Sequence, residues 1–360
     1  MTSSRAEGTP RLVLDWLTVK SHVQGVAFLT GEPADLLNDF KQTNCWMHVG
    51  DAVVPGPRKF WKIAQLARHC TREFRPDLVI AWPNGFSHWI FLGVRSTGSR
   101  TALLSHAGNP PGENWYGRYC ITWLCLWTAA LCRGKMVACS RYVQRQFTRI
   151  ALVPKIAVRF AYNSVQVEAI ARRADAARAT RQLNGHFRVI MVATLESHKD
   201  HVTLIRAAKI LRERGVKIEI LLAGAGRLEA SLKDLTAQLG VGGFVKFLGA
   251  RRDVPELLGQ SDLFVLSTTP REGRPGVILE ALAAGLPIIA TDVEPLREVL
   301  EEGRWGKLVG VGDIEALATA LDDAANAGPA DLKVIGERRE FARAFSPERM
   351  ISDYLKEARW

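Results

Sequence analysis

Apolar runs that predict buried strands alternate with helical patterns through the second half of the sequence. Short apolar runs predict the strands, and apolar residues spaced three and four apart predict the helices. The strands are predicted at 187–193, 217–223, 244–248, 262–267 and 287–290, and the helices at 202–214, 228–239, 254–258 and 276–284. This alternation favours right-handed crossovers and a parallel sheet covered on both faces. The second half is therefore predicted to be a doubly wound α/β domain.

The first half shows a similar but noisier pattern. Strands are predicted at 11–17, 77–82, 101–106, 135–140 and 157–162, and helices at 60–74 and 117–132. The Ala/Arg-rich segment 165–185 has no strand pattern and marks a boundary. A chain of 360 residues exceeds what one core usually supports. We expect an N-terminal domain at 1–168, a C-terminal domain at 180–345, and a terminal helix at 346–360 that packs back on the N-terminal domain.

Composition points to a soluble protein of the cytoplasm. A hydrophobic content of 47% and a charged content of 24% are ordinary for globular chains. The longest uncharged apolar stretch, 119–132, is shorter than the roughly 18–20 residues of a spanning helix. The first 25 residues lack a signal-peptide pattern. The six cysteines show no C-x-x-C pair and no histidine at zinc-finger spacing, which favours reduced structural thiols over a metal site.

The net charge of +11 lies entirely in the first half. Residues 1–175 hold 22 Lys and Arg against 11 Asp and Glu, whereas the remainder holds 26 of each. Eight of the ten tryptophans precede residue 130. Tryptophan with basic residues suits an anionic membrane surface. It also suits nucleic acid, but the sequence has no nucleic-acid motif. A solvated basic surface stays open as the alternative to membrane contact.

Two glutamates, Glu272 and Glu280, are separated by seven residues near a predicted sheet edge. Glu272 lies in a Gly/Pro-rich loop after a predicted strand, and Glu280 lies about one turn into the following helix. A carboxylate accepts hydrogen bonds from both neighbouring hydroxyls of a ribose, which suits Glu280, and Glu272 is placed for the hydroxyls of a sugar. The amides of Gly273 to Gly276 would face the phosphates or the sugar. Alternatively, Glu280 only favours the positive end of its helix.

Two further loops offer phosphate contacts. Gly224 and Arg227 lie in a glycine-containing turn that follows a strand and opens a helix, where bare backbone can approach a phosphate. Lys199 precedes a helix, and a cation beside helix N-terminal amides can hold a diphosphate. A tight turn also requires glycine without any ligand, and a loop lysine is often merely exposed. Both alternatives stay open.

His106 ends a predicted strand of the first half. At a strand's carboxyl end, facing a cleft between domains, it is placed to contact a transferring sugar. A buried structural histidine is the alternative.

These motifs resemble the retaining glycosyltransferases of family 4, also called glycosyl transferases group 1. The resemblance runs through 187–321 and includes V-A-T-L-E-S-H-K-D-H at 192–201, L-L-A-G-A-G-R at 221–227, V-K-F-L-G-A-R-R-D-V at 245–254 and the two glutamates. The first half contains only weaker matches to the family's motifs. The family has the GT-B fold, in which two doubly wound, Rossmann-like parallel-sheet domains face a cleft.

The resemblance implies a nucleotide-diphosphate-sugar donor on the C-terminal domain and an acceptor on the N-terminal domain. It implies catalytic roles for Glu272 at the donor sugar, Lys199 at the diphosphate and His106 near the sugar. Glu280 would bind the ribose. The other implied donor-binding residues are Gly273, Arg274, Pro275, Gly276, Gly224, Arg227, Arg251 and Thr194. The family needs no obligatory metal or cofactor, and front-face attack retains the anomeric configuration.

Two positions depart from the family pattern. A basic residue usually precedes the lysine by five positions, where this chain has Thr194, so Arg227 or Arg271 is expected to compensate. The family's glycine-rich loop after the first strand is missing, since 20–25 holds one glycine. We predict a sugar transferase acting on a lipid-linked or polysaccharide acceptor, as in lipopolysaccharide synthesis, peripheral on the inner face of the membrane. An epimerase and a non-catalytic nucleotide-sugar-binding protein are the alternatives.

Overall fold

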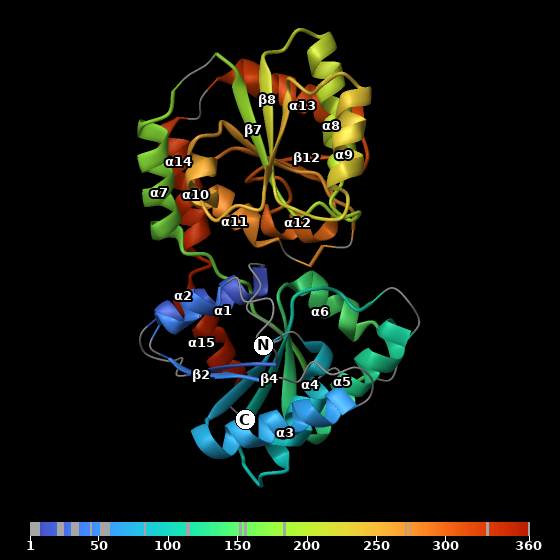
Figure 1. The fold of residues 1–360 in the computed structure, drawn as a ribbon, viewed down its shortest axis with the longest axis vertical. Helices are drawn as coiled ribbons and strands as arrows, with labels where there is room; N and C mark the ends of the chain where they lie inside the picture. Colours follow the sequence, from blue (N-terminus) through green and yellow to red (C-terminus); the bar gives the residue numbers. More distant parts are fainter. Residues whose placement is uncertain are drawn as a thin grey trace. The chain divides into compact units, whose positions relative to one another are not determined.

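The chain forms two compact α/β units in the computed structural model (Figure 1). Unit 1 comprises Met1–Ser164 with Pro347–Trp360, and unit 2 comprises Val165–Ser346. The unit boundary lies at the start of the Ala/Arg-rich segment. The structure describes residues 8–19, 25–29, 36–43, 45–50, 58–82, 84–112, 116–150, 153–154, 157–182, 185–270, 272–273, 275–328 and 331–358.

Unit 2 is a parallel sheet with helices on both faces. Its strands are β7 (Phe187–Val192), β8 (Ile218–Ala223), β9 (Val245–Gly249), β10 (Leu263–Leu266), β11 (Ile288–Thr291) and β12 (Lys307–Val309). Its helices are α7 (Val167–Ala179), α8 (His201–Glu213), α9 (Glu229–Gln238), α10 (Val254–Gly259), α11 (Gly276–Ala283), α12 (Glu294–Val299), α13 (Ile314–Ala327) and α14 (Leu332–Arg343). Every strand predicted in this half is confirmed, whereas β12 and the helices α7, α12, α13 and α14 lay outside the prediction.

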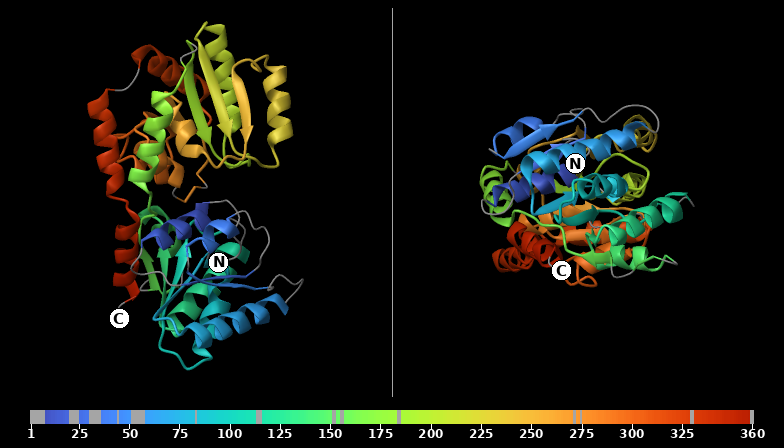
Figure 2. Two further views of the ribbon diagram at one scale, coloured as in Figure 1. Left: turned by 60° about the vertical axis from the view of Figure 1, so that its left-hand side comes forward. Right: turned by 90° about the horizontal axis from the view of Figure 1, so that it is seen from below.

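The sheet of unit 2 has the strand order β12-β11-β10-β7-β8-β9, and Figure 2 shows β7, β8 and β9 side by side. Helices α8, α9 and α13 lie on one face, while α7, α10, α11 and α14 lie on the other. Burial on both faces explains why the strands read as continuous apolar runs: each residue of β8, β10 and β11 is buried.

Unit 1 is also a parallel α/β unit. Its strands are β1 (Gly25–Phe28), β2 (Trp46–Val49), β3 (Leu78–Ala81), β4 (Ala102–Ala107), β5 (Gly134–Ala138) and β6 (Val158–Phe160). Its helical segments are α1 (Gly8–Thr18), α2 (Leu37–Lys41), α3 (Arg58–Phe74), η1 (Asn84–Phe86), α4 (Ser87–Arg95), η2 (Tyr116–Ile121), α5 (Thr122–Leu131), α6 (Arg141–Thr148) and α15 (Pro347–Ala358). Parallel pairing joins β1 to β2, and β3-β4-β5-β6 form a four-stranded sheet.

The strand β4 separates two apolar layers in unit 1. Leu103 packs with the α4 and α5 side, whereas Leu104 packs with α1 and α15 on the other side. Side chains alternate between the faces of a strand, so adjacent leucines enter different cores. Among the described residues, no helix is both long enough and apolar enough to cross a membrane.

The predicted strand at 11–17 is wrong, because this segment belongs to the helix α1. Leu12, Val13 and Trp16 are buried together against α15, and the Trp16 ring lies edge-on to Tyr354 at 5.0 Å. A short apolar run fits a strand or a buried helix equally well. Packing against a helix from the other end of the sequence decides the outcome. The first strand is β1, so 20–25 is not the loop that follows it, and 30–35 lies outside the described residues.

Candidate active site

The strand order of unit 2 reverses between β7 and β10. From β7 the chain builds outward through β8 and β9, then returns to place β10 on the other side of β7. In open parallel sheets such a switch point separates the loops at the carboxyl ends of two neighbouring strands. The loops concerned follow β7 at 193–200 and β10 at 267–275.

Backbone and hydroxyl groups tie these two loops together. The His198 carbonyl accepts hydrogen bonds from the Thr269 amide at 3.0 Å and from the Thr268 hydroxyl at 2.8 Å. The Asp200 amide donates to the Ser267 carbonyl at 3.1 Å. The Asp200 carboxylate also caps α8, since it accepts from the Thr203 amide at 3.1 Å. The position of Lys199 is therefore fixed from both sides.

Lys199 and Glu272 form an ion pair at this switch point. The Lys199 side chain is 12% exposed and that of Glu272 is 8% exposed. The Thr268 hydroxyl shares its single proton between the His198 carbonyl and the same carboxylate oxygen, Oε1, at 3.1 Å. A pair buried to this extent is held in one geometry, because either charge left alone would be costly. The structure thus brings together two of the three residues predicted to be catalytic.

The helix α11 begins directly after this pair. Pro275 is its N-cap, and the Pro275 side chain makes no capping hydrogen bond. Backbone amides at a helix N-terminus favour an anion. Gly273 and Pro275 are buried, Gly276 opens the helix, and Glu280 is half-buried one turn further along. Arg274 and Arg271 lie outside the described residues.

The glycine of the turn after β8 is required by packing. A Cβ on Gly224 would lie 1.9 Å from the Ala193 carbonyl oxygen, and one on Gly226 would lie 2.4 Å from that of Leu195. The turn after β8 therefore presses directly against the backbone that leaves β7. This close approach accounts for the two glycines without a ligand, and contact of Gly224 with a donor stays a prediction.

The predicted cations outside the switch point have acidic partners. Arg227 Nε lies 2.6 Å from Glu196 Oε2, although the Arg227 side chain is 73% exposed. Arg251 Nε donates to Asp253 Oδ1 at 2.8 Å, and this bond raises the pKa of Arg251. Thr194 is exposed. Compensation for Thr194 by Arg227 would require that arginine to exchange Glu196 for a phosphate.

His106 belongs to unit 1, where it is almost fully buried in an aromatic stack. Its Nδ1 lies 2.7 Å from the Tyr354 hydroxyl oxygen, and its ring stacks on Trp82 at 4.3 Å. Burial lowers the pKa of His106 to about 3, so the ring is neutral under ordinary conditions. The predicted contact of His106 with a sugar stays a prediction.

Sequence reasoning missed Thr268 and His201. His201 is buried at the start of α8, and its Nδ1 donates to the Lys199 carbonyl at 2.8 Å. Burial, the largest influence, lowers the pKa of His201 to about 4. A neutral ring with a donating Nδ1 fixes the tautomer and holds the backbone of Lys199. The signal for Thr268 was the hydroxyl run Ser267-Thr-Thr269, directly after a buried strand.

A family of known proteins matches the part of the chain that builds this site. Glycosyl transferases group 1 match residues 174–340. The putative glycosyltransferase EpsD of Bacillus subtilis is 32% identical over 167 residues, 46% of this chain and 44% of the relative. The lipopolysaccharide core biosynthesis glycosyltransferase LpsE of Rhizobium meliloti is 34% identical over 37% of this chain and 38% of the relative. The chain thus spans under half the length of these relatives.

Solved structures resemble the fold of nearly the whole chain. A glycosyltransferase from Rickettsia africae superposes with a TM-score of 0.79 at 17% identity, over 99% of this chain and 96% of the other. Anabaena Alr3699/HepE, in complex with UDP and glucose, superposes with a TM-score of 0.78 at 19% identity, over 99% and 98%. The likeness concerns the fold, and the predicted GT-B fold is confirmed.

Proposed function

We propose that the chain transfers a sugar, with retention of anomeric configuration, from a nucleotide-diphosphate-sugar to a lipid-linked or polysaccharide acceptor. The match of residues 174–340 to the glycosyl transferases group 1 supports this proposal. The observation that carries the proposal is the convergence of Lys199 and Glu272 at the switch point of unit 2. A cation and a carboxylate side by side match a donor that offers phosphates and hydroxyls.

Each group at the switch point has a role in donor binding. The Lys199 ammonium binds the diphosphate, together with backbone amides at the start of α11. Release from Lys199 leaves Glu272 to accept hydrogen bonds from hydroxyls of the donor sugar, with Thr268 still oriented on the carboxylate. Glu280 binds the ribose. The ion pair thus keeps both charges satisfied until the donor replaces each partner.

The chemistry rests on stabilising the departing nucleotide diphosphate. Lys199 and the amide dipoles of α11 neutralise the negative charge that develops on the leaving phosphate. No resident metal is required for this role. The acceptor hydroxyl attacks from the face that the diphosphate leaves, which retains the configuration, and its proton passes to the departing diphosphate.

Relatives support a glycan acceptor. LpsE of Rhizobium meliloti is a lipopolysaccharide core biosynthesis glycosyltransferase, and AmsK of Erwinia amylovora is an amylovoran biosynthesis glycosyltransferase. Structures of Anabaena Alr3699/HepE contain UDP-glucose or UDP with glucose. A uridine nucleotide-sugar is therefore the first donor to test.

The donor proposal predicts a thermal shift with one member of a nucleotide-sugar panel. A donor at ~100 times its Kd stabilises by about 2.7 kcal/mol, which raises the Tm of a unit of this size by about 5–10 °C. Lys199→Gln keeps a hydrogen-bond donor for Glu272 but removes the charge, so the shift should largely disappear. Lys209→Ala, which alters an exposed ion pair with Glu213 on α8, should keep it. Loss of the shift in both variants, or in neither, would contradict the role of Lys199.

We further propose that unit 1 contacts an anionic membrane through α5. The α5 face consists of Trp123, Leu124, Trp127 and Leu131, whose exposed fractions are 44%, 44%, 39% and 80%. These residues share one side of the helix, and the two tryptophan rings lie 5.6 Å apart. Tryptophan favours the membrane–water interface.

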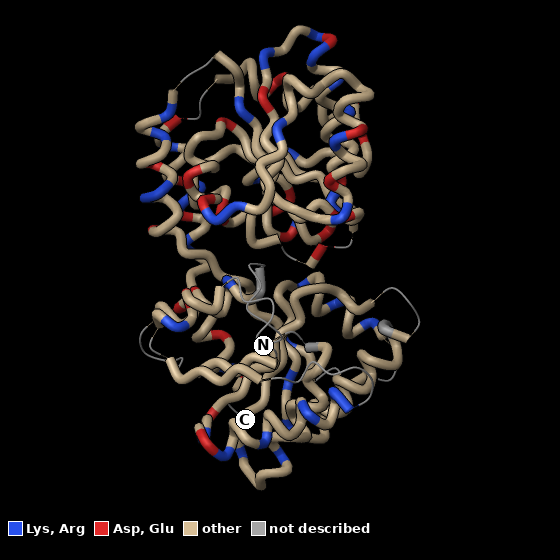
Figure 3. The backbone as a smooth tube through the Cα atoms, in the orientation of Figure 1, with Lys and Arg blue, Asp and Glu red and all other residues tan. Residues whose placement is uncertain are grey.

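The charge around the α5 face suits an anionic surface. Figure 3 shows mainly basic residues along α3 and around α5, whereas acidic and basic residues are interspersed over unit 2. Between Arg58 and Pro111 the sequence has eight Lys and Arg but only Glu73 and Asp77 as acids. Each basic residue near such a surface contributes about 1 kcal/mol. The apolar face and the basic surroundings therefore support the same partner.

Flotation with lipid vesicles tests the α5 face. The wild-type chain should float with phosphatidylcholine vesicles that contain about one third phosphatidylglycerol, and less so at high salt. Replacing Trp123, Trp127 and Leu131 with serine should reduce the bound fraction at least about fivefold. The control replaces Leu332 and Val334, exposed apolar residues of α14 in unit 2, with serine. If the wild-type chain does not float with these vesicles, the membrane proposal is wrong and the donor proposal is unaffected.

A further inference from the structure

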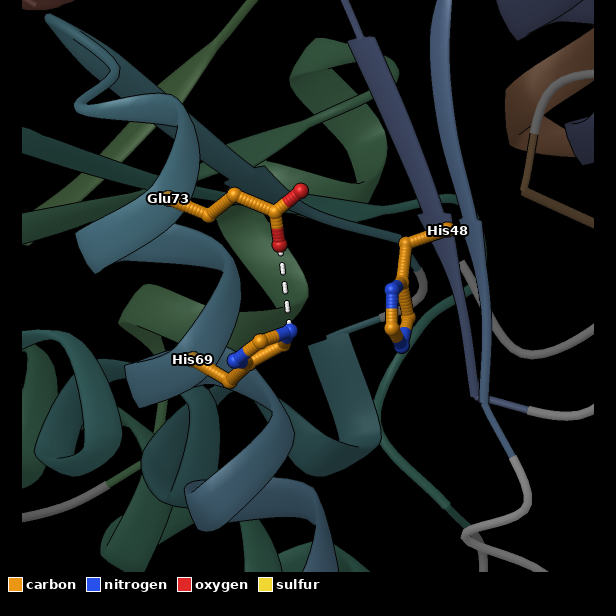
Figure 4. Close-up of side chains that lie close together, drawn as sticks. All are labelled: His48, His69 and Glu73. Atoms are coloured by element: carbon orange, nitrogen blue, oxygen red, sulfur yellow. Dashed lines mark ion pairs between the residues drawn. The ribbon is translucent and has the colours of Figure 1, made fainter.

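Three side chains of metal-ligating types converge in unit 1, and none of them is assigned to sugar transfer. His48, His69 and Glu73 each direct one donor atom into a common space, and these atoms all lie within 4.8 Å of one another (Figure 4). The His69 Nε2 atom lies 3.1 Å from Glu73 Oε2. His48 is half-buried, whereas His69 and Glu73 are exposed, so ions from solvent reach the group directly.

Two regular elements supply the three side chains. His69 and Glu73 are four residues apart on α3, which places them on one face of the helix. His48 comes from β2, and its ring centroid lies 5.4 Å from that of His69. Donors held by a helix and a strand are positioned more firmly than donors in loops.

Trp46 and its neighbours fix the orientation of the His48 and Glu73 side chains. The Trp46 indole Nε1 donates to Glu73 Oε1 at 3.4 Å, which leaves Oε2 directed at His69. The Trp46 ring stacks on His48 at 6.1 Å and packs against Phe74 at 5.2 Å. Outer groups that fix the orientation of ligating side chains are a regular part of metal sites.

We propose that His48, His69 and Glu73 form a binding site for a divalent transition-metal ion of the zinc type. Two imidazoles and one carboxylate are a ligand set that Zn²⁺ accepts, with water in the fourth position. Bonds of about 2.0–2.2 Å place tetrahedral ligand atoms roughly 3.3–3.5 Å apart. The His69–Glu73 distance of 3.1 Å lies just below this range, and His48, whose ligand atom lies within 4.8 Å of the other two, moves inward to complete the triangle. The bound ion would join β2 to α3.

The neighbouring thiol is not part of this ligand set. Cys70 follows His69 in sequence, but the ligand atoms that converge are those of His48, His69 and Glu73. The site therefore has nitrogen and oxygen ligands only, a property that spectroscopy can detect. It is independent of the proposed sugar transfer, which uses unit 2 for the donor.

Calorimetric titration of the full chain with Zn²⁺, repeated with Co²⁺ under visible spectroscopy, tests this site. The wild-type chain should bind one ion at the site, with the Co²⁺ complex showing d–d bands of a four-coordinate site and no thiolate charge-transfer band. His48→Ala, His69→Ala and Glu73→Gln should each weaken binding at least about tenfold. His186→Ala, which removes an exposed histidine of unit 2, should leave binding unchanged.

A stability measurement covers the case of a poorly folded variant. Zn²⁺ should raise the Tm of the wild-type chain and of His186→Ala, with no rise in the folded Glu73→Gln variant. Absence of binding to the wild-type chain would overturn the proposal. Wild-type Zn²⁺ affinity in all three site variants would overturn it as well, and so would a thiolate charge-transfer band, since the ion would then lie elsewhere.

Discussion

Replacing Glu272 with glutamine is expected to lower kcat/KM for sugar transfer by about 100-fold or more, since a hydrogen bond to a charged group contributes about 1.5–3 kcal/mol and this carboxylate serves more than one hydroxyl. The amide oxygen of glutamine still accepts from Thr268 and Lys199, so the loops after β7 and β10 keep their connections. The loss should appear in turnover and in sugar binding, and Tm should fall as well, because glutamine leaves the buried charge of Lys199 without its counter-ion.

The measurement compares initial rates of the wild-type chain and the variant with the donor identified by thermal shift. Glu229→Gln is the matched control, because Glu229 lies in the same unit but forms an ion pair with Lys233 on the surface of α9. The control should keep wild-type kcat/KM. Equal rates for Glu272→Gln and the wild type would remove Glu272 from the mechanism, and transfer by neither protein from any donor would count against the proposed activity.

Replacing Gly224 with alanine is expected to destabilise unit 2 by about 3 kcal/mol, since inserting a methyl group into a packed contact usually costs 1–3 kcal/mol and sometimes more. The new Cβ would start 1.9 Å from the Ala193 carbonyl oxygen. To remove this clash, the turn after β8 must move away from β7. This movement would also disturb the hydrogen bond from the Gly224 amide to the Gly249 carbonyl at 2.8 Å. A fall in Tm of about 6–12 °C follows for a unit of this size.

Gly336→Ala is the control, and it is expected to increase stability, whereas Gly224→Ala is expected to decrease it. Gly336 is exposed in the middle of α14, and a Cβ there would meet nothing within 4 Å. Alanine should stabilise this helix by roughly 0.5–1 kcal/mol. Thermal unfolding of both variants checks the pair. If Gly224→Ala were as stable as the wild type but bound the donor poorly, the glycine would serve the ligand and the packing explanation would be wrong.

Much of unit 2 was predictable because its elements are locally encoded. Buried parallel strands appear as apolar runs, and the intervening helices carry their own spacing, so the predicted strand at 217–223 and the observed β8 agree closely. The residues of the switch point were also found, since polar residues after apolar runs stand out. Their mutual arrangement was not available, because the Lys199–Glu272 contact joins residues far apart in sequence.

Unit 1 was less predictable because its short apolar segments are stabilised by distant partners. The residues 11–17 carry no period that distinguishes strand from helix, and Tyr354, from the other end of the sequence, completes the cluster that buries Trp16. The group of His48, His69 and Glu73 had no sequence signal either, since its spacing matches no zinc-finger pattern. It exists because β2 lies beside α3.

The sequence by itself determined the parallel α/β class, the family resemblance and the residue types at the candidate site. Local apolar runs and short motifs encode these properties, and they need no knowledge of distant neighbours. Only the tertiary structure decided that Lys199 neutralises Glu272, that packing requires Gly224, and that His106 is buried against Tyr354. Each of these depends on contacts between segments that strand order and helix packing bring together, and a linear pattern carries no record of such contacts.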